Sequence, residues 1–147
     1  MPAIVFIVDI NYQRAKSTAE KLNSVHPDWL TIIVDSCFEA KKAAEVFDLN
    51  AAIINHELPD GDGLELMIEL QEKNPFLAPI ILIPTSFSQK LREIVKFCGA
   101  LDLLEEPLDN GTLVTTVERA IEQCNQRASL QKTEEQRPKI KSAILEG

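Results

Sequence analysis

The sequence predicts an α/β fold in which a parallel five-stranded sheet is covered by helices on both faces. Three observations lead to this prediction. Five short apolar runs recur along the chain, at 3–8, 30–34, 51–54, 80–83 and 101–104. Each run precedes a segment with apolar residues at helical spacing, and Pro, Gly, Asn, Asp or Ser separates the two. Strands that alternate with helices in this way form right-handed βαβ units, in which the strands are parallel.

The first two units have recognisable helix starts. Residues 3–8 are apolar and β-branched, which is typical of a buried strand. Asn11 is expected to cap the next helix, whose inner face comprises Ala15, Ala19 and Leu22. Residues 30–34 are the second strand, and Ser36 is expected to cap a helix with Ala40, Ala43, Ala44 and Phe47 on its inner face.

The third and fourth units follow the same pattern. The helix after strand 51–54 is expected to bury Leu64, Met67, Ile68 and Leu70. After strand 80–83, Ser88 is expected to cap a helix that buries Leu91, Ile94, Val95 and Cys98. Gly99 is a suitable end for this helix, since glycine readily adopts the backbone conformation found at many helix ends.

The fifth strand, 101–104, leads to a last helix that opens at Pro107 and Asp109 and carries a stripe of Leu113, Val117, Ile121 and Cys124. From residue 126 the composition changes to Gln, Lys, Glu and Arg. We therefore predict a domain at 1–125 and a charged helical extension or linker at 126–147, in which Pro138 ends the helix. The extension is expected to lead to an output domain in a longer protein.

Composition excludes several classes of function. The formal net charge is −8 and no dense run of Lys and Arg is present, which argues against nucleic-acid binding by this chain. No apolar run approaches the ~20 residues of a membrane span, so no membrane contact is expected. The three cysteines lack metal-binding or redox spacing, which suggests reduced thiols in a cytoplasmic protein.

Five βα units fit the flavodoxin-like order 2-1-3-4-5, in which helices and sheet form a three-layer sandwich. This order brings the carboxyl ends of the first, third, fourth and fifth strands together. Asp9, Asn55, Pro84 and Glu106 are therefore expected to surround one shallow pocket at that edge.

The stretch 51–63 reads Ala-Ala-Ile-Ile-Asn-His-Glu-Leu-Pro-Asp-Gly-Asp-Gly. It resembles the central motif of bacterial response-regulator receiver domains, with Pro59, Asp62 and Gly63 at the expected offsets. The resemblance covers 3–124 and implies a module of two-component or phosphorelay signalling. In that family an aspartate accepts a phosphoryl group, and here position 55 is Asn.

Other residues of the motif also depart from the family pattern. The acidic pair that holds Mg²⁺ falls on Asp9 and Ile10, and the hydroxyl residue falls on Pro84, with Thr85 next to it. The lysine falls on Glu106. The resemblance therefore implies a degenerate receiver, or pseudo-receiver, that is neither phosphorylated nor an enzyme, that has no catalytic residue and that works without Mg²⁺ or another cofactor.

Other interpretations of the pocket remain open. Asp9 is expected either to hold the loop after its strand or, with Glu106, to be a weak candidate for binding a cation, and Asn55 to bond the loop backbone. A second hypothesis is a working receiver phosphorylated at an unusual residue, such as Asp62 or His56. A third is a flavodoxin-like small-ligand binder or enzyme, although no glycine-rich loop follows the first strand.

Receiver domains commonly bind partners through the face of their fourth helix, fifth strand and fifth helix. The resemblance places Lys90, Lys96, Leu103 and Arg119 on this face. Expected partners are a histidine kinase, another regulator or the protein's own output domain, and the stripe of the last helix is expected to support a homodimer.

Overall fold

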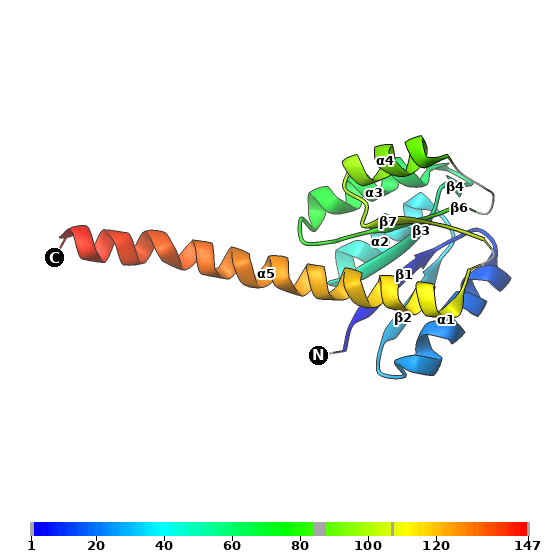
Figure 1. Cartoon of the computed structure of the whole chain (residues 1–147), viewed down its shortest axis with the longest axis horizontal. Helices are drawn as coiled ribbons and strands as arrows, with labels where there is room; N and C mark the ends of the chain where they lie inside the picture. Colours follow the sequence, from blue (N-terminus) through cyan, green and yellow to red (C-terminus); the bar gives the residue numbers. More distant parts are fainter. Residues whose placement is uncertain (1, 84–87, 107, 147) are drawn as a thin grey trace.

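The computed structural model describes residues 2–83, 88–106 and 108–146 (Figure 1). Five parallel strands form the main sheet: β1 (Ile4–Val8), β2 (Leu30–Val34), β3 (Ala51–Asn55), β6 (Ile80–Ile83) and β7 (Asp102–Glu105). Their order is β2-β1-β3-β6-β7, which confirms the predicted order 2-1-3-4-5. A short antiparallel pair, β4 (Glu57–Leu58) and β5 (Gly61–Asp62), was not predicted from the sequence.

The helices are α1 (Tyr12–Val25), α2 (Cys37–Val46), α3 (Gly63–Lys73), α4 (Gln89–Phe97) and α5 (Asn110–Glu146). The apolar cores show which helices cover each face of the sheet. Val5 and Ile7 of β1 pack with residues of α1 and α5. Phe6 and Val8, which point to the opposite face, pack with residues of α2, α3 and α4. The alternation along one strand therefore builds both halves of a three-layer sandwich.

The predicted helix starts at Asn11, Ser36 and Ser88 and the predicted end at Gly99 are confirmed. The side chains of Asn11, Ser36 and Ser88 each accept a hydrogen bond from a backbone N–H of the first turn that follows. Gly99 follows Cys98, the C-cap of α4, and has φ of +114°, a conformation that L side chains rarely adopt. A Cβ at this position would also lie 2.7 Å from the Gln71 amide.

Two helices bury a different set of apolar residues from the one that we predicted. On α3, Leu66 is buried and Ile68 is 39% exposed, because the stripe that contacts the sheet follows Leu66, Met67 and Leu70. On α4, Val95 is buried and Ile94 is 45% exposed. Each residue turns a helix by about 100°, so a position next to the central stripe faces partly toward solvent.

Helix α5 continues well past the body of the domain (Figure 1). The prediction that Pro138 ends this helix is wrong. Proline removes one backbone N–H donor and costs a helix interior about 3 kcal/mol, but the bonds of the turns on either side do not depend on that donor. In the described part of the chain, no helix is both long and apolar enough to cross a membrane.

Candidate functional site

The carboxyl edge of the sheet carries the predicted site residues that the structure describes. Asp9 follows β1 and Asn55 ends β3, and each is only 2% exposed. Ile10 is 55% exposed. Asp9 and Ile10 line one hollow at this edge, and Glu106 lines another together with Arg14. Pro84 and Thr85 lie outside the described residues.

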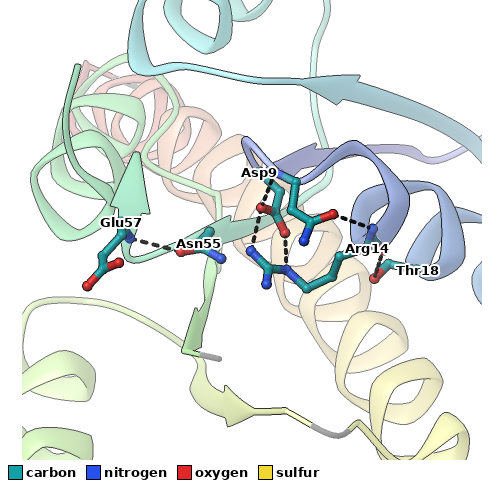
Figure 2. Close-up of polar contacts among 6 residues, drawn as sticks. Asp9, Arg14, Thr18, Asn55 and Glu57 are labelled. Atoms are coloured by element: carbon teal, nitrogen blue, oxygen red, sulfur yellow. Dashed lines mark hydrogen bonds and ion pairs between the residues drawn. The ribbon is translucent and has the colours of Figure 1, made fainter. Parts of the chain in front are cut away.

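Arg14, on the first turn of α1, is the site residue that our sequence reasoning missed. Its Nε donates to Oδ2 of Asp9 at 2.6 Å, and its Nη2 donates to Oδ1 of Asp9 at 2.7 Å (Figure 2). The hydrogen bond to Asp9 raises the pKa of Arg14, as do the negative charges of Asp9 and Glu106, while burial opposes the change. The guanidinium is therefore a permanent cation on the Asp9 carboxylate.

Asp9 has a third hydrogen bond that fixes the loop after β1. The backbone N–H of Asn11 donates to Oδ1 of Asp9 at 2.9 Å. The side-chain oxygen of Asn11 in turn accepts from the N–H of Arg14 at 3.1 Å, which caps α1. Both oxygens of Asp9 are thus engaged, and the interpretation of Asp9 as a residue that holds this loop is confirmed.

This arrangement does not fit a Mg²⁺ site. Mg²⁺ binds through carboxylate oxygens at close range, and the guanidinium of Arg14 already lies against both oxygens of Asp9. In the described part of the chain, no group of three or more His, Cys, Asp or Glu side chains is placed to hold a metal ion. The neighbouring residue, Ile10, is aliphatic and offers no side-chain oxygen to a metal ion.

Asn55 bonds the loop that follows β3, as predicted. Its Oδ1 accepts from the backbone N–H of Glu57 at 2.9 Å (Figure 2). Its buried Nδ2 has no hydrogen-bond partner among the described residues. The side-chain oxygen of Asn55 therefore fixes the start of the loop by accepting from one backbone donor.

The two alternative acceptors of our second hypothesis differ in their surroundings. Asp62 is the N-cap of α3, and its Oδ1 accepts from the N–H of Leu64 at 2.8 Å. The Nδ1 of His56 is buried without a hydrogen-bond partner among the described residues, and its Nε2 lies 3.5 Å from the carboxylate of Glu57. Glu57 has an 83% exposed side chain.

Asp60 connects the β4–β5 turn to a distant helix. Its carboxylate accepts from the backbone N–H groups of Cys37, at 2.8 Å, and Phe38, at 3.0 Å. Both hydrogen bonds lower the pKa of Asp60, and the bond from Cys37 has the larger effect. A carboxylate at the start of α2 also interacts favourably with the helix dipole. The turn after β3 is therefore fixed to the amino end of α2.

Gly63 is required by close backbone packing at the start of α3. Its N–H donates to the carbonyl of His56 at 2.9 Å. A Cβ at this position would overlap the carbonyl oxygen of Asn55 and lie 2.8 Å from Cα of His56. The glycine of the motif therefore allows α3 to begin directly against the end of β3.

The four residues predicted for the partner face differ in exposure. Lys90, Lys96 and Arg119 are exposed. Leu103 is 0% exposed and belongs to the core beneath α4, so its prediction as a contact residue is wrong. A strand position that is covered by a helix has no free surface.

Two apolar residues lie on the outer surface of α4, an exposure that we did not predict. Phe97 is 93% exposed and Ile94 is 45% exposed. They are three positions apart in the sequence, a spacing that places both on one side of a helix. The sequence alone does not distinguish this exposed pair from apolar residues that face the sheet, because both follow helical spacing.

Comparison with known proteins identifies the fold. No family model and no curated protein matches the sequence. A CheY-like response regulator receiver domain protein from Methanospirillum hungatei JF-1 superposes with a TM-score of 0.76 and 19% identity, over 86% of this chain and 99% of that one. The chain has the receiver-domain fold.

Two further receiver structures support this conclusion. The receiver domain of Francisella response regulator 1452 gives a TM-score of 0.73 with 20% identity, over 82% of this chain and 97% of its own. The receiver domain of NtrX from Brucella abortus gives 0.72 with 21% identity, over 80% and 98%. The receiver fold extends over the sandwich, and Ile10, Asn55 and Glu106 lie at the carboxyl edge of its sheet.

Proposed function

We propose that this chain is a signalling module of a two-component or phosphorelay system that acts by protein-protein contact and does not accept a phosphoryl group. The observation that supports this proposal is the ion pair of Arg14 with Asp9. The guanidinium of Arg14 binds the carboxylate oxygens of Asp9, which would otherwise be available to a metal ion. We infer a cytoplasmic protein with no catalytic residue of its own.

The remaining pocket residues also disfavour phosphoryl transfer. The side-chain amide of Asn55 is a poor nucleophile, since its nitrogen lone pair is delocalised. Glu106 stands where receivers carry a lysine, so an attraction for phosphate is replaced by a repulsion. At 4 Å and an effective dielectric constant near 20, each of these interactions is worth about 4 kcal/mol before screening. Transferred phosphoryl groups depend on such electrostatic stabilisation.

The exposed surface of α4 is the proposed contact surface. Ile94 and Phe97 form its apolar part, and the exposed Lys90 and Lys96 lie on the same helix. Exposed aromatic side chains often contribute most of the energy of a protein interface. Lysines around an apolar centre favour a partner with acidic side chains at its rim, such as a histidine kinase, another regulator or an output domain.

We propose that residues 126–147 connect the receiver-like unit to a further domain. The contact of α5 with the body continues slightly past residue 125, because Nη1 of Arg127 donates to the carbonyl of Leu77 at 3.0 Å. Beyond this anchor, α5 extends from the sandwich (Figure 1). A continuous helix is a suitable connection because it fixes the distance between the units that it joins.

The proposal is tested by intact-mass measurement after incubation with a small phosphodonor and Mg²⁺, with a conventional receiver domain as the positive control. We expect no phosphoryl adduct on this chain and complete labelling of the control. An adduct would contradict the proposal. Peptide mapping of an adduct to His56 or Asp62 would instead support phosphorylation at an unusual residue.

Restoration of the acceptor alone is expected to fail. The variant Asn55→Asp should remain unlabelled, because Arg14 and Glu106 are still present. A matched variant combines Asn55→Asp with Ile10→Asp, Arg14→Ala and Glu106→Lys, and it should gain labelling if these residues are the obstacle. Labelling of the single variant at the level of the control receiver would show that Arg14 and Glu106 do not prevent the reaction.

A further inference from the structure

A groove runs between α5 and Trp29, which directly precedes β2 at the amino end of the parallel strands. It has a volume of about 720 Å³ and its lining includes Trp29, Glu118, Ile121, Glu122, Ser129 and Leu130. The indole of Trp29 stacks on the His26 ring at 3.8 Å, and Nε2 of His26 lies 2.9 Å from the carboxylate of Glu118. The aromatic wall is therefore held in place by contacts with α5.

The chemistry of the groove favours a basic amphipathic helix. Trp29 and Ile121 are partly buried and Leu130 is 63% exposed, so together they offer an apolar strip. Glu118 and Glu122 are exposed at its border, and no Lys or Arg is among the described residues that line it. An apolar strip beside two carboxylates fits a helix that carries apolar residues on one side and Lys or Arg beside them.

The chain itself contains a segment of this kind. Residues 137–145 read Arg-Pro-Lys-Ile-Lys-Ser-Ala-Ile-Leu, with three basic residues and no acidic residue. Ile140 and Ile144 are four positions apart, the spacing that aligns side chains along a helix. The segment belongs to α5, which is helical from Asn110 to Glu146.

This segment cannot reach the groove of its own molecule. The middle of the groove on α5 lies near residue 124 and the middle of the basic segment lies at residue 141. In a continuous helix these positions are about 25 Å apart, at 1.5 Å per residue. The complementary segment must therefore come from another molecule.

Charge decides the direction in which two such helices associate. In a parallel pair, each groove faces the same groove of the other copy, so Glu118 and Glu122 meet their own counterparts. In an antiparallel pair, the basic segment of each copy lies along the acidic groove of the other. We propose that two copies of this chain associate through antiparallel α5 helices, with residues 137–145 of each copy in the Trp29 groove of its partner. This proposal does not depend on the proposed function or on the α4 surface.

The first test is sedimentation equilibrium of the full chain at several concentrations and two salt concentrations. We expect a monomer-dimer equilibrium that weakens as salt increases, since exposed charges are screened. Glu122→Lys should weaken the dimer by roughly tenfold or more. The control Glu72→Lys makes the same charge change on an exposed part of α3 and should leave the dimer intact.

A charge exchange tests the pairing directly. A double variant with Lys139→Glu and Lys141→Glu should also fail to form the homodimer. Mixed with the Glu122→Lys variant, it should form a heterodimer, because one acidic groove and one basic segment are then exchanged together. Circular dichroism of each variant shows whether loss of the dimer reflects unfolding.

Zero-length carbodiimide cross-linking tests the orientation. In a mixture of ¹⁴N-labelled and ¹⁵N-labelled protein, we expect links between Lys139 or Lys141 of one isotope and Glu118 or Glu122 of the other. A chain that stays monomeric at all concentrations would overturn the proposal. A dimer that Glu122→Lys leaves unchanged would also overturn the proposal. If Phe97→Ser abolished that dimer, the interface would be assigned to α4.

Discussion

The ion pair between Arg14 and Asp9 can be measured through the variant Arg14→Met. Methionine keeps a long side chain and a high helix propensity, so the change removes the guanidinium with little effect on α1 itself. Asp9 is 2% exposed and would keep the N–H of Asn11 as its hydrogen-bond donor. The carboxylate would then be buried without its countercharge.

The magnitude follows from burial. Removal of one partner from a fully buried ion pair costs about 3–5 kcal/mol, because the remaining charge is uncompensated. The side chain of Arg14 is 22% exposed, so water reaches part of the pair and reduces the cost. We therefore expect the free energy of unfolding to fall by about 2–4 kcal/mol, or Tm by roughly 5–15 °C.

The assay is urea denaturation at pH 7 in a double-mutant cycle with Asp9→Asn. When Asp9→Asn is already in place the buried charge is absent, so Arg14→Met should cost much less, with a coupling energy of about 1.5–3 kcal/mol. Arg92→Met is a suitable comparison, because Nη1 of Arg92 lies 2.8 Å from Asp102 and the side chains of this pair are more exposed than those of Arg14 and Asp9. A coupling energy below about 0.5 kcal/mol would refute the assignment of Arg14 as the countercharge of Asp9.

Three further predictions follow from the loop after β3 and its contacts. Gly63→Ala should destabilise the protein by about 2–4 kcal/mol in the same urea assay, because the added methyl overlaps the Asn55 carbonyl; a loss below about 0.5 kcal/mol would contradict this packing. Because the pKa of Asp60 is lowered in the folded protein, its contribution to stability is complete above about pH 4 and is lost as the pH falls through the folded pKa. In the variant Asp60→Asn, Tm should therefore fall less steeply between pH 4 and pH 2. A variant whose Tm depends on pH as the original protein's does would contradict this prediction. Burial first, and then Asp60, raises the pKa of the Cys37 thiol from 9.0 to about 11. The thiol of the folded protein should therefore react with iodoacetamide at pH 8 far more slowly than the thiol of the urea-unfolded protein, and the free energy of unfolding should decline as the pH rises from 9 to 11. Equal alkylation rates in the two states would contradict this prediction.

The fold was predictable because its signals are local. Apolar runs bounded by Asn, Ser and Pro mark the strands and caps, and Asn11, Ser36 and Ser88 cap helices as expected. The burial of Ile68 and Ile94 was predicted wrongly, because apolar identity does not show how wide a stripe the sheet covers. The small β4–β5 pair was missed because two-residue strands have no periodicity to detect.

The candidate site was only partly predictable. The positions of Asp9 and Asn55 follow from the strand ends, which the sequence marks clearly. Arg14 was missed because charged residues on the first turn of a helix are usually assigned to solvent. Its guanidinium instead reaches back from α1 to the end of β1, five residues earlier, which depends on the direction of a long side chain. An arginine within one helical turn of a buried strand-end carboxylate was the available signal.

The countercharge of Asp9 belongs to the polypeptide. The occupancy of a bound metal ion depends on its concentration, and chelators or competing ions can remove it. A guanidinium that is covalently attached to the chain has no dissociation equilibrium with the solvent and stays charged at all physiological pH values. The charge balance around Asp9 should therefore be the same in a cell rich in magnesium and in one depleted of it. The ion pair of Asp9 with Arg14 is therefore established when the chain folds and needs no bound ion.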